Sequence, residues 1–265
     1  MVHVAFVTGG ASGIGKAVVK RFLRAGIQVG FLDMNQTASK KLFDELSSTD
    51  LVYVCGDVRK VVDVQTAVKT TLDYFGHLNS VVTCAGVHAM NTIRDFREDE
   101  WSTIFDTNVK GTIYAIRESL PSLEAQKNGA VVLVSADQAL IGKTGTFVYG
   151  ASKGAIAQMT RSLAVDLAAQ GIRVNAVCPG TIRTPMAHAV ISKWAEKGPE
   201  RDVEKALKKA WEDIAVNYPL RRVGEAEEVA ELIHFLATDV SSFITGGLFP
   251  VDGGLTCGFV SRPSA

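Results

Sequence analysis

Short apolar runs alternate along the chain with longer segments in which apolar residues recur at helical spacing. An apolar run of about four to eight residues predicts a strand, whereas the helical spacing predicts an amphipathic helix. The predicted strands are Val2–Val7, Ile27–Leu32, Leu51–Cys55, Leu78–Thr83, Ala130–Val134, Ile172–Val177 and Gly247–Val251. Most of them are apolar throughout, which is typical of a parallel sheet covered by helices on both faces.

The segments between these strands predict the helices. They are Lys16–Ala25, a helix beginning near Gln36, Lys60–Phe75, Asp99–Gln126, Phe147–Ala169 and Ala226–Leu236. Pro121 should disturb the last part of the longest one, because proline has no N–H to donate within a helix. Strands and helices alternate without a repeat or a linker, so we expect one α/β domain over residues 1–265.

A charged segment interrupts this alternation between Met186 and Tyr218. It has a helical pattern, and Trp194 and Trp211 are its large apolar residues, so both are expected to anchor it. We interpret residues 186–218 as an insertion that folds over the binding crevice as a lid. The alternative is a solvated pair of surface helices.

Composition limits the classes of function. Of the 265 residues 47% are hydrophobic, and 28 Lys and Arg balance 28 Asp and Glu, so no nucleic-acid or membrane partner is indicated. The four cysteines lie far apart without the spacing of a metal site or a disulfide framework, so no metal is expected. The chain shows no signal-like N-terminal segment and no apolar run that could span a bilayer, which favours a cytoplasmic setting.

A glycine-rich segment, Thr8-Gly9-Gly10-Ala11-Ser12-Gly13-Ile14-Gly15, joins the first predicted strand to the first predicted helix. Glycines let the backbone approach a ligand closely, and the helix N-terminus offers free N–H groups to a pyrophosphate. The spacing GxxxGxG differs from the GxGxxG of the usual dinucleotide fingerprint. The alternative is an ordinary tight turn, but the order strand, turn, helix is the one that dinucleotide binding requires.

Asp33 ends the second predicted strand, about 20 positions after the glycine-rich turn. A carboxylate at this position can accept hydrogen bonds from the adenosine ribose and would repel a 2′-phosphate. Ser12 and Met34, where a basic residue could hold that phosphate, are uncharged, so the sequence favours NAD over NADP. The alternative, which does not exclude ribose binding, is that Asp33 caps the helix beginning near Gln36.

Tyr149 and Lys153 are four positions apart in a predicted helix, so their side chains should point the same way. A neighbouring ammonium favours phenolate, which would let the tyrosine act as an acid or base nearer neutral pH. The alternative is two residues on a partly exposed helix face. A functional role of the pair is supported by residues at the ends of the predicted strands, because the carboxyl ends of parallel strands meet at one crevice. They are Gly9, Asp33, Asp57, Gly86, Ser135 and Gly180.

Together these residues resemble the short-chain dehydrogenase/reductase family over nearly all of the chain from Val4 to Thr256. The resemblance rests on the glycine-rich segment, Asp57-Val58, Ala85-Gly86, Asn108, Tyr149 with Lys153, Pro179-Gly180 with Thr184, and Val251-Asp252-Gly253-Gly254. It implies a single Rossmann-like, doubly wound domain with a seven-stranded parallel sheet and helices on both faces. It also implies a homotetramer or homodimer built partly on the Asn108 and Tyr149 helices.

The same resemblance implies roles for individual residues. Tyr149 would be the acid/base, Lys153 would bind the nicotinamide ribose and assist Tyr149, and Asn108 would hold a water of the proton relay. Asp57 and Val58 would flank the adenine, and Thr184 would contact the carboxamide. The complete set expected to bind NAD is Gly9, Ser12, Gly13, Ile14, Gly15, Asp33, Asp57, Val58, Ala85, Gly86, Tyr149, Lys153, Pro179, Gly180, Ile182 and Thr184.

Two positions depart from the family pattern. Thr83-Cys84 stands where the family commonly has Asn-Asn, and Ala136 stands 13 positions before Tyr149, where the family has a catalytic serine. Ser135 is one place earlier and should point to the opposite face of its strand. A local bulge that presents Ser135, or a polar group such as Asp137, Gln138 or Thr146, could replace the lost hydroxyl; otherwise activity is low.

The sequence thus predicts an NAD-dependent oxidoreductase that interconverts a secondary alcohol and its ketone. The charged lid, and Arg183 beside the expected nicotinamide contact, favour a sugar, polyol or hydroxy acid. Arg183 could pair with a substrate carboxylate or belong to a surface salt bridge. Ala136, Gln138 and Arg183 are the candidate substrate contacts. The competing hypothesis, motivated by Ala136, is a nucleotide-binding protein with little catalysis.

Overall fold

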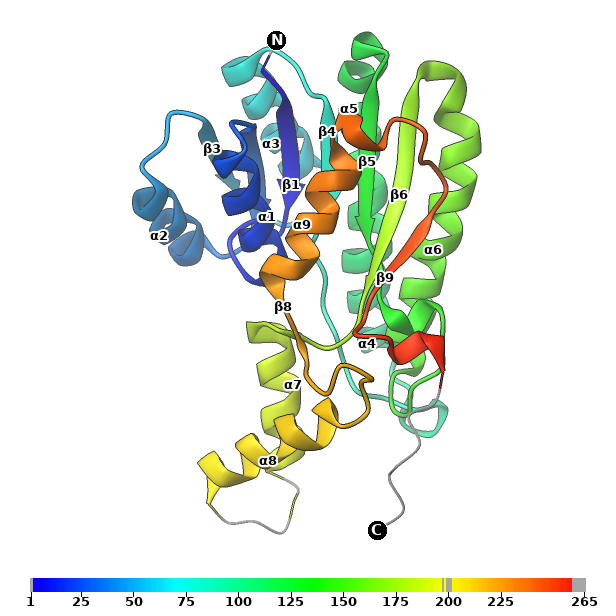
Figure 1. The fold of residues 1–265 in the computed structure, drawn as a ribbon. Helices are drawn as coiled ribbons and strands as arrows, with labels where there is room; N and C mark the ends of the chain where they lie inside the picture. The colour runs from blue at the N-terminus through cyan, green and yellow to red at the C-terminus, as the bar shows by residue number, and fades with distance from the viewer. Residues whose placement is uncertain (1, 197, 199–201, 259–265) are drawn as a thin grey trace.

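The computed structural model describes residues 2–196, 198 and 202–258. Seven strands form one sheet in the order β3-β2-β1-β4-β5-β6-β9, and each neighbouring pair is parallel. They are β1 (Val4–Thr8), β2 (Gln28–Asp33), β3 (Leu51–Cys55), β4 (Ser80–Thr83), β5 (Gly129–Val134), β6 (Ile172–Pro179) and β9 (Leu248–Val251). The predicted doubly wound sheet is therefore confirmed, and its carboxyl ends point downward in Figure 1.

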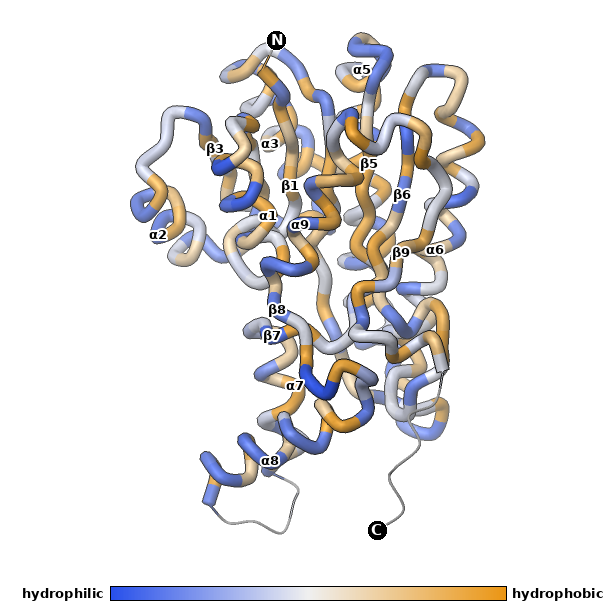
Figure 2. Tube along the Cα trace, viewed as in Figure 1, coloured by the Kyte–Doolittle hydropathy of each residue, from blue (hydrophilic) through white to orange (hydrophobic). Residues whose placement is uncertain are grey.

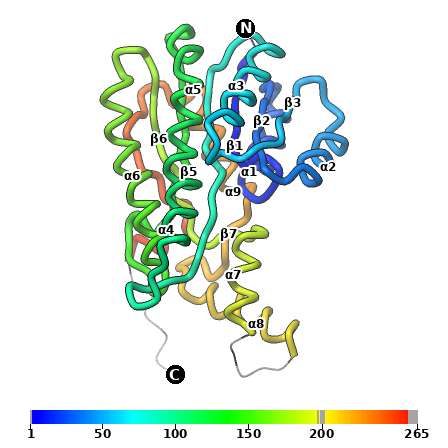
Figure 3. The backbone as a smooth tube through the Cα atoms, turned by 180° about the vertical axis from the view of Figure 1, so that it is seen from behind, coloured from blue at the N-terminus to red at the C-terminus, as the bar shows by residue number. Residues whose placement is uncertain are grey.

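Helices cover both faces of this sheet, as predicted. The α-helices are α1 (Gly13–Arg24), α2 (Gln36–Leu46), α3 (Val61–Phe75), α4 (Glu98–Phe105), α5 (Gly111–Gln126), α6 (Phe147–Leu167), α7 (Pro185–Ala195), α8 (Val203–Ala215) and α9 (Ala226–Ala237). Helices α1, α2 and α9 lie on one face, while α3, α5 and α6 lie on the other, which Figure 3 shows from behind. No described helix has the length and apolar character needed to cross a membrane.

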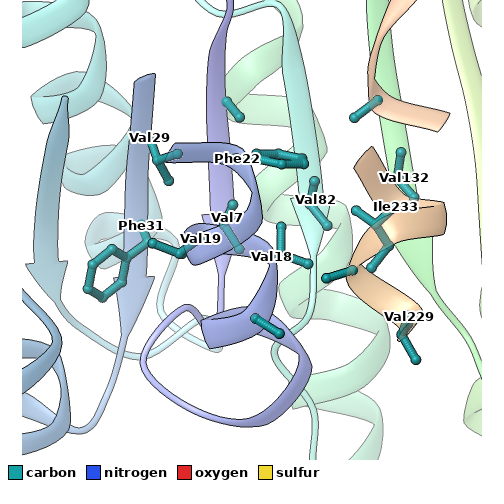
Figure 4. Packing of buried hydrophobic residues seen from close by; sticks show 14 of the residues in the cluster. Val7, Val18, Val19, Phe22, Val29, Phe31, Val82, Val132, Val229 and Ile233 are labelled. Carbon is teal, nitrogen blue, oxygen red and sulfur yellow. The ribbon is translucent and has the colours of Figure 1, made fainter. Parts of the chain in front are cut away.

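The alternation of side chains along β1 explains why both faces are covered. Ala5 and Val7 point into the cluster beneath α1 and α9, where Phe22 and Ile233 pack (Figure 4). Val4 and Phe6 belong to the opposite cluster. A strand that is buried on both sides favours apolar residues at most positions, which explains why most of the strands are predominantly apolar. Hydrophobic colour accordingly concentrates between the layers in Figure 2.

The long helix predicted over Asp99–Gln126 is interrupted. Helix α4 ends at Phe105, one π-helical turn covers Asp106–Lys110, and α5 continues from Gly111. Such a turn inserts one residue into the helical ladder and often lies at a functional site. It contains Asn108. Pro121, in contrast, lies within α5 without ending it, since the helix continues to Gln126.

The segment predicted as a lid forms the helix pair α7–α8, which extends beyond the carboxyl ends of the strands in Figure 1. The pair has its own small apolar cluster, in which Trp211 packs beside the buried Ile191 and Ala210. Trp194 is 52% exposed and lies outside this cluster, so the expectation that it anchors the segment is wrong. Residues 197 and 199–201 of the predicted lid, and residues 1 and 259–265 of the predicted domain, lie outside the described residues.

Two short parallel strands lie where α7–α8 joins the rest of the domain. Strand β7 (Ile182–Arg183) enters α7 and pairs with β8 (Gly224–Glu225), which follows α8. The sequence pattern did not reveal these two-residue strands, because they are too short to show any periodicity. They fix the two ends of the insertion next to each other.

Candidate active site

The glycine-rich turn packs directly on the end of β4. Gly9 has a φ of +69°, and a Cβ added there would lie 2.8 Å from the backbone N of Ala85. A Cβ on Gly15 would lie 2.0 Å from the carbonyl oxygen of Gly9. Larger residues at these two positions would therefore force the turn away from the sheet. Thr8 adds to the contact, because its Oγ1 accepts a hydrogen bond from Ala85 N at 3.2 Å.

The N-terminus of α1 fits an anionic group. Ser12 is the N-cap residue, but its side chain makes no capping hydrogen bond, and the first turn carries no acidic residue. The N–H groups of Gly13, Ile14 and Gly15 thus face the crevice side of the helix end, where helix geometry leaves them without an intrahelical acceptor. The helix dipole adds partial positive charge at the same place. A pyrophosphate has the charge and the acceptor atoms that this end lacks.

Asp33 is held at the end of β2 by backbone amides. Its Oδ2 accepts from Ala11 N at 3.0 Å and its Oδ1 from Asn35 N at 2.9 Å. The N-cap of α2 is Asn35, whose side chain accepts from Ala38 N. Asp33 is therefore not the capping residue, and its carboxylate is fixed beside the glycine-rich turn.

The next strand end carries Asp57 and Val58. Arg59 forms a bidentate ion pair with Asp57, with a shortest N–O distance of 2.6 Å, and this pair lowers the pKa of Asp57. Val58 is only 7% exposed and packs against Gly111 at the start of α5. The predicted adenine side of the crevice therefore has one polar and one apolar group next to each other.

The π-helical turn directs Asn108 at the loop after β4. The side chain accepts from Val87 N at 2.8 Å and donates to Val87 O at 3.1 Å, so it pairs with both backbone groups of one residue. It also donates to Ser152 Oγ at 3.1 Å. Ser152 is on α6 between Tyr149 and Lys153, and a Cβ added to Gly86 would touch Asn108 Oδ1 at 3.3 Å. Asn108 thus ties the β4 loop to the helix of the YxxxK pair.

Tyr149 and Lys153 lie side by side as predicted, with Lys153 Nζ 5.6 Å from the centroid of the phenol ring. Nζ donates to the Val134 carbonyl at 2.8 Å, at the end of β5. Burial lowers the pKa of Lys153 to about 8. Burial, and secondly the negative charge of Asp137, raise the pKa of Tyr149 above its ordinary value. The expected lowering of the tyrosine pKa is therefore wrong here, because desolvation of the phenolate outweighs the nearby ammonium.

The last predicted contacts lie around β6 and β7. Pro179 ends β6, and Gly180 is crowded, since a Cβ there would lie 2.9 Å from the Tyr218 ring. Ile182 is buried, and Thr184 caps α7 by accepting from Ala187 N at 3.2 Å. A Cβ on Gly13 would lie 3.3 Å from the Thr184 methyl group. This contact brings the loop after β6 to the glycine-rich turn.

Arg183 is engaged at the base of α7–α8. Its Nε donates to Glu225 at 3.1 Å, and its guanidinium carbon lies 4.8 Å from the centroid of the Trp211 ring. Both partners of the ion pair are about half exposed. Of the two interpretations of Arg183, the structure shows a surface salt bridge, next to the start of α7.

Comparison with known proteins adds to this geometry. A family model described as enoyl-(acyl carrier protein) reductase matches residues 9–256. The chain belongs to the short-chain dehydrogenase/reductase family. It is an oxidoreductase of that family, as its relatives are.

Relatives cover nearly the whole chain. The oxidoreductase UcpA of Escherichia coli O157:H7 is 36% identical over 255 residues, which are 95% of this chain and 94% of that protein. L-fucose dehydrogenase of Mus musculus is 35% identical over 262 residues, 98% and 91% of the two chains. The ligand-free structure of Thermoplasma acidophilum aldohexose dehydrogenase is 29% identical, has a TM-score of 0.88, and covers 99% of this chain and 98% of its own. Other solved neighbours hold NADP or NADPH, so cofactor choice has to be argued from this chain's own residues.

At the serine position of this short-chain dehydrogenase/reductase, Ala136 is 5% exposed and extended, with a φ of −163°. Ser135 does not replace the missing hydroxyl, because its Oγ donates to the Lys153 carbonyl at 2.9 Å. No bulge turns it toward Tyr149. Thr146 Oγ1 donates to the Lys143 carbonyl at 2.8 Å. Gln138 lines a surface pocket formed by the β5–α6 loop and the start of α6.

Asp137 is a buried carboxylate next to this position. Only 1% of its side chain is exposed, and its Oδ2 accepts from Lys143 Nζ at 2.6 Å, whereas Oδ1 has no partner. Burial raises the pKa of Asp137, and the Lys143 ammonium opposes that rise. The ion pair with Lys143 favours the ionised carboxylate, which accepts hydrogen bonds and cannot supply the hydrogen that the serine would donate.

His88 is a site residue that the sequence did not reveal. It lies two positions after Gly86, and its ring centroid is 4.3 Å from that of Tyr149. Its Nδ1 is buried without a hydrogen-bond partner, and burial lowers the pKa of the ring to about 4. The only available signal was its position just beyond the carboxyl end of β4, and many residues share such a position.

Proposed function

We propose that this chain is an NAD-dependent oxidoreductase that interconverts a secondary alcohol and its ketone, with a sugar or polyol as substrate. The observation that carries the proposal is the convergence of three side chains. Lys153 is buried and Tyr149 is half-buried beside it at the end of β5, and Asn108 links their helix to the loop after β4. Ligands of open parallel sheets bind at these strand ends.

The bound nicotinamide supplies the hydride chemistry and, when oxidised, adds positive charge to the crevice. The residues that would hold the dinucleotide are the glycine-rich turn and α1 N-terminus for the pyrophosphate, Asp33 for the adenosine ribose, and Asp57 with Val58 beside the adenine. Lys153 would bind the nicotinamide ribose. The glycine cradle and the uncapped amides of α1 fit this group.

Tyr149 carries the proton between substrate and protein. Its raised pKa keeps the phenol protonated near neutral pH, which suits donation to the oxygen of a ketone as that oxygen gains charge. In the reverse direction the phenolate takes the alcohol proton. Lys153, fixed by the Val134 carbonyl, stabilises the phenolate form through its charge.

Among the three favoured substrate classes, a sugar or polyol fits better than a hydroxy acid. A hydroxy acid needs a cation for its carboxylate, and Arg183 is already paired with Glu225 and stacked on Trp211. The names of two relatives, an L-fucose dehydrogenase and an aldohexose dehydrogenase, agree with a sugar. Nicotinamide reduction should therefore be measured with aldohexoses, 6-deoxyhexoses, polyols and hydroxy acids. The proposal fails if the protein binds NAD and oxidises none of them.

The α7–α8 pair acts as a lid hinged at β7–β8, with the Arg183–Trp211 contact holding it to the body of the protein. Trp211→Ala should raise the substrate KM several-fold and change NAD affinity less than about twofold, because the lid covers the substrate rather than the adenosine half. Trp194→Ala is the matched control, since Trp194 is exposed and outside the cluster. Equal effects of the two substitutions on KM, or none from either, would contradict the lid assignment.

Ala136 favours one competing function, a nucleotide-binding protein with little catalysis. Loss of an oxyanion-type donor costs on the order of 10²–10³ in turnover. The two functions differ in turnover rather than in NAD binding, so the substrate panel distinguishes them.

A further inference from the structure

Three hydroxyl groups around the Tyr149–Lys153 pair already donate to backbone carbonyls. Ser135 Oγ donates to the Lys153 carbonyl, and Ser152 Oγ donates to the Tyr149 carbonyl at 2.7 Å. Thr146 Oγ1 donates within its own loop, to Lys143. Each hydroxyl has one hydrogen to give, so none of these three supplies a donor to a substrate oxygen at Tyr149. A side chain in contact with Tyr149 can supply the donor that Ala136 lacks.

The loop after β4 brings His88 into contact with Tyr149. Its ring packs against the phenol of Tyr149, with centroids 4.3 Å apart and planes inclined at 49°. The residue before it, Val87, is pinned by Asn108 through both its N–H and its carbonyl. The imidazole is therefore held through the backbone of Val87, which Asn108 of the π-helical turn fixes, and through the ring contact with Tyr149 on α6.

The ring has the protonation state that a hydrogen-bond donor needs. Burial, and secondly the positive charges of Lys153 and Lys143, lower its pKa to about 4, so the imidazole is neutral near pH 7. A neutral imidazole has one N–H and one bare nitrogen. Nδ1 is buried and has no hydrogen-bond partner, and a buried N–H without an acceptor destabilises the protein. That cost places the bare nitrogen at Nδ1 and the hydrogen on Nε2, for which no protein partner is found among the described residues.

We propose that His88 is a further catalytic residue of this oxidoreductase, whose Nε2–H donates a hydrogen bond to the substrate oxygen that Tyr149 protonates, in place of the absent serine. The inference rests on the proposed alcohol–ketone chemistry. His88 gives no proton away: the oxygen gains its proton from Tyr149, the carbon exchanges hydride with the nicotinamide, and His88 stabilises the negative charge between those events.

His88→Leu and His88→Gln test this role in the full-length chain. Leu removes the donor and keeps an apolar side chain, and should lower kcat by about 10²-fold or more, with KM and NAD affinity changed less than about threefold. Gln carries an amide N–H near the place of Nε2 and should lose less than about tenfold. A purely structural role predicts instead that both variants lose activity together with thermal stability or NAD affinity.

Ala136→Ser separates the catalytic role from all structural ones. In the unmodified chain His88 already supplies the hydrogen bond, so the added serine should raise kcat less than about tenfold. In the His88→Leu background the same serine should recover most of the lost turnover, because two donors to one oxygen are not additive. The assignment is overturned if His88→Leu keeps its kcat, if Gln is as impaired as Leu, or if serine fails to rescue. Absence of turnover in the unmodified chain with bound NAD overturns the proposed function itself.

Discussion

Tyr149→Phe is expected to lower kcat by about 10³-fold or more and to leave NAD affinity within about twofold. The substitution removes the proton carrier, while the remaining ring keeps the contacts with His88 and with Lys153 that hold it in the crevice. Steady-state turnover gives the first quantity, and quenching of protein fluorescence by NAD gives the second.

Tyr114→Phe on α5 is the matched control, because it removes the same atom from a tyrosine outside the site. Its kcat should equal that of the unmodified protein. If Tyr149→Phe retains more than about a tenth of the original turnover, the acid/base has been assigned to the wrong residue.

NAD should bind at least about tenfold more tightly than NADP, which corresponds to about 1.4 kcal/mol. The carboxylate of Asp33 is fixed by Ala11 N and Asn35 N, so it cannot swing away from a 2′-phosphate without losing both hydrogen bonds. Like charges brought together in this way repel, and the repulsion selects against the phosphorylated cofactor. Dissociation constants for both dinucleotides, measured at one ionic strength, give the ratio.

Asp33→Ala should narrow the gap between the two cofactors. Asp44→Ala is the control, because it removes the same charge from an exposed position on α2, where Asp44 pairs with Lys40. That variant should leave the ratio unchanged. Equal or tighter binding of NADP to the unmodified protein would show that Asp33 does not set cofactor choice.

The seven strands and their parallel arrangement could be predicted from the sequence, because each strand and each intervening helix has its own local pattern. Runs such as residues 4–7 and 131–134 are apolar on both faces, and the intervening helices carry their own periodicity. The YxxxK pair was equally predictable, since four positions on a helix fix the relative direction of two side chains.

Some features of the site could not be predicted from the sequence, because they depend on contacts between segments that are far apart in the chain. The π-helical turn at Asn108 arises where that side chain pairs with Val87, 21 positions away. His88, in the loop after β4, contacts Tyr149 on α6, and no local sequence pattern predicts this contact. The pKa of Tyr149 is raised instead of lowered, because it depends on burial, which is set by the whole fold. The cytoplasmic setting and the homodimer or homotetramer stay predictions.

The most direct test of the proposed alcohol oxidation is whether hydrogen is transferred from the substrate carbon to the nicotinamide. Sugars and polyols that carry deuterium on the carbon to be oxidised are incubated with NAD and the protein, and the nicotinamide is analysed by NMR. We expect deuterium at C4 of the nicotinamide with at least one of these substrates, and no deuterium there with the Tyr149→Phe variant. If NAD binds but no substrate transfers its deuterium, the chain is a nucleotide-binding protein without this catalysis.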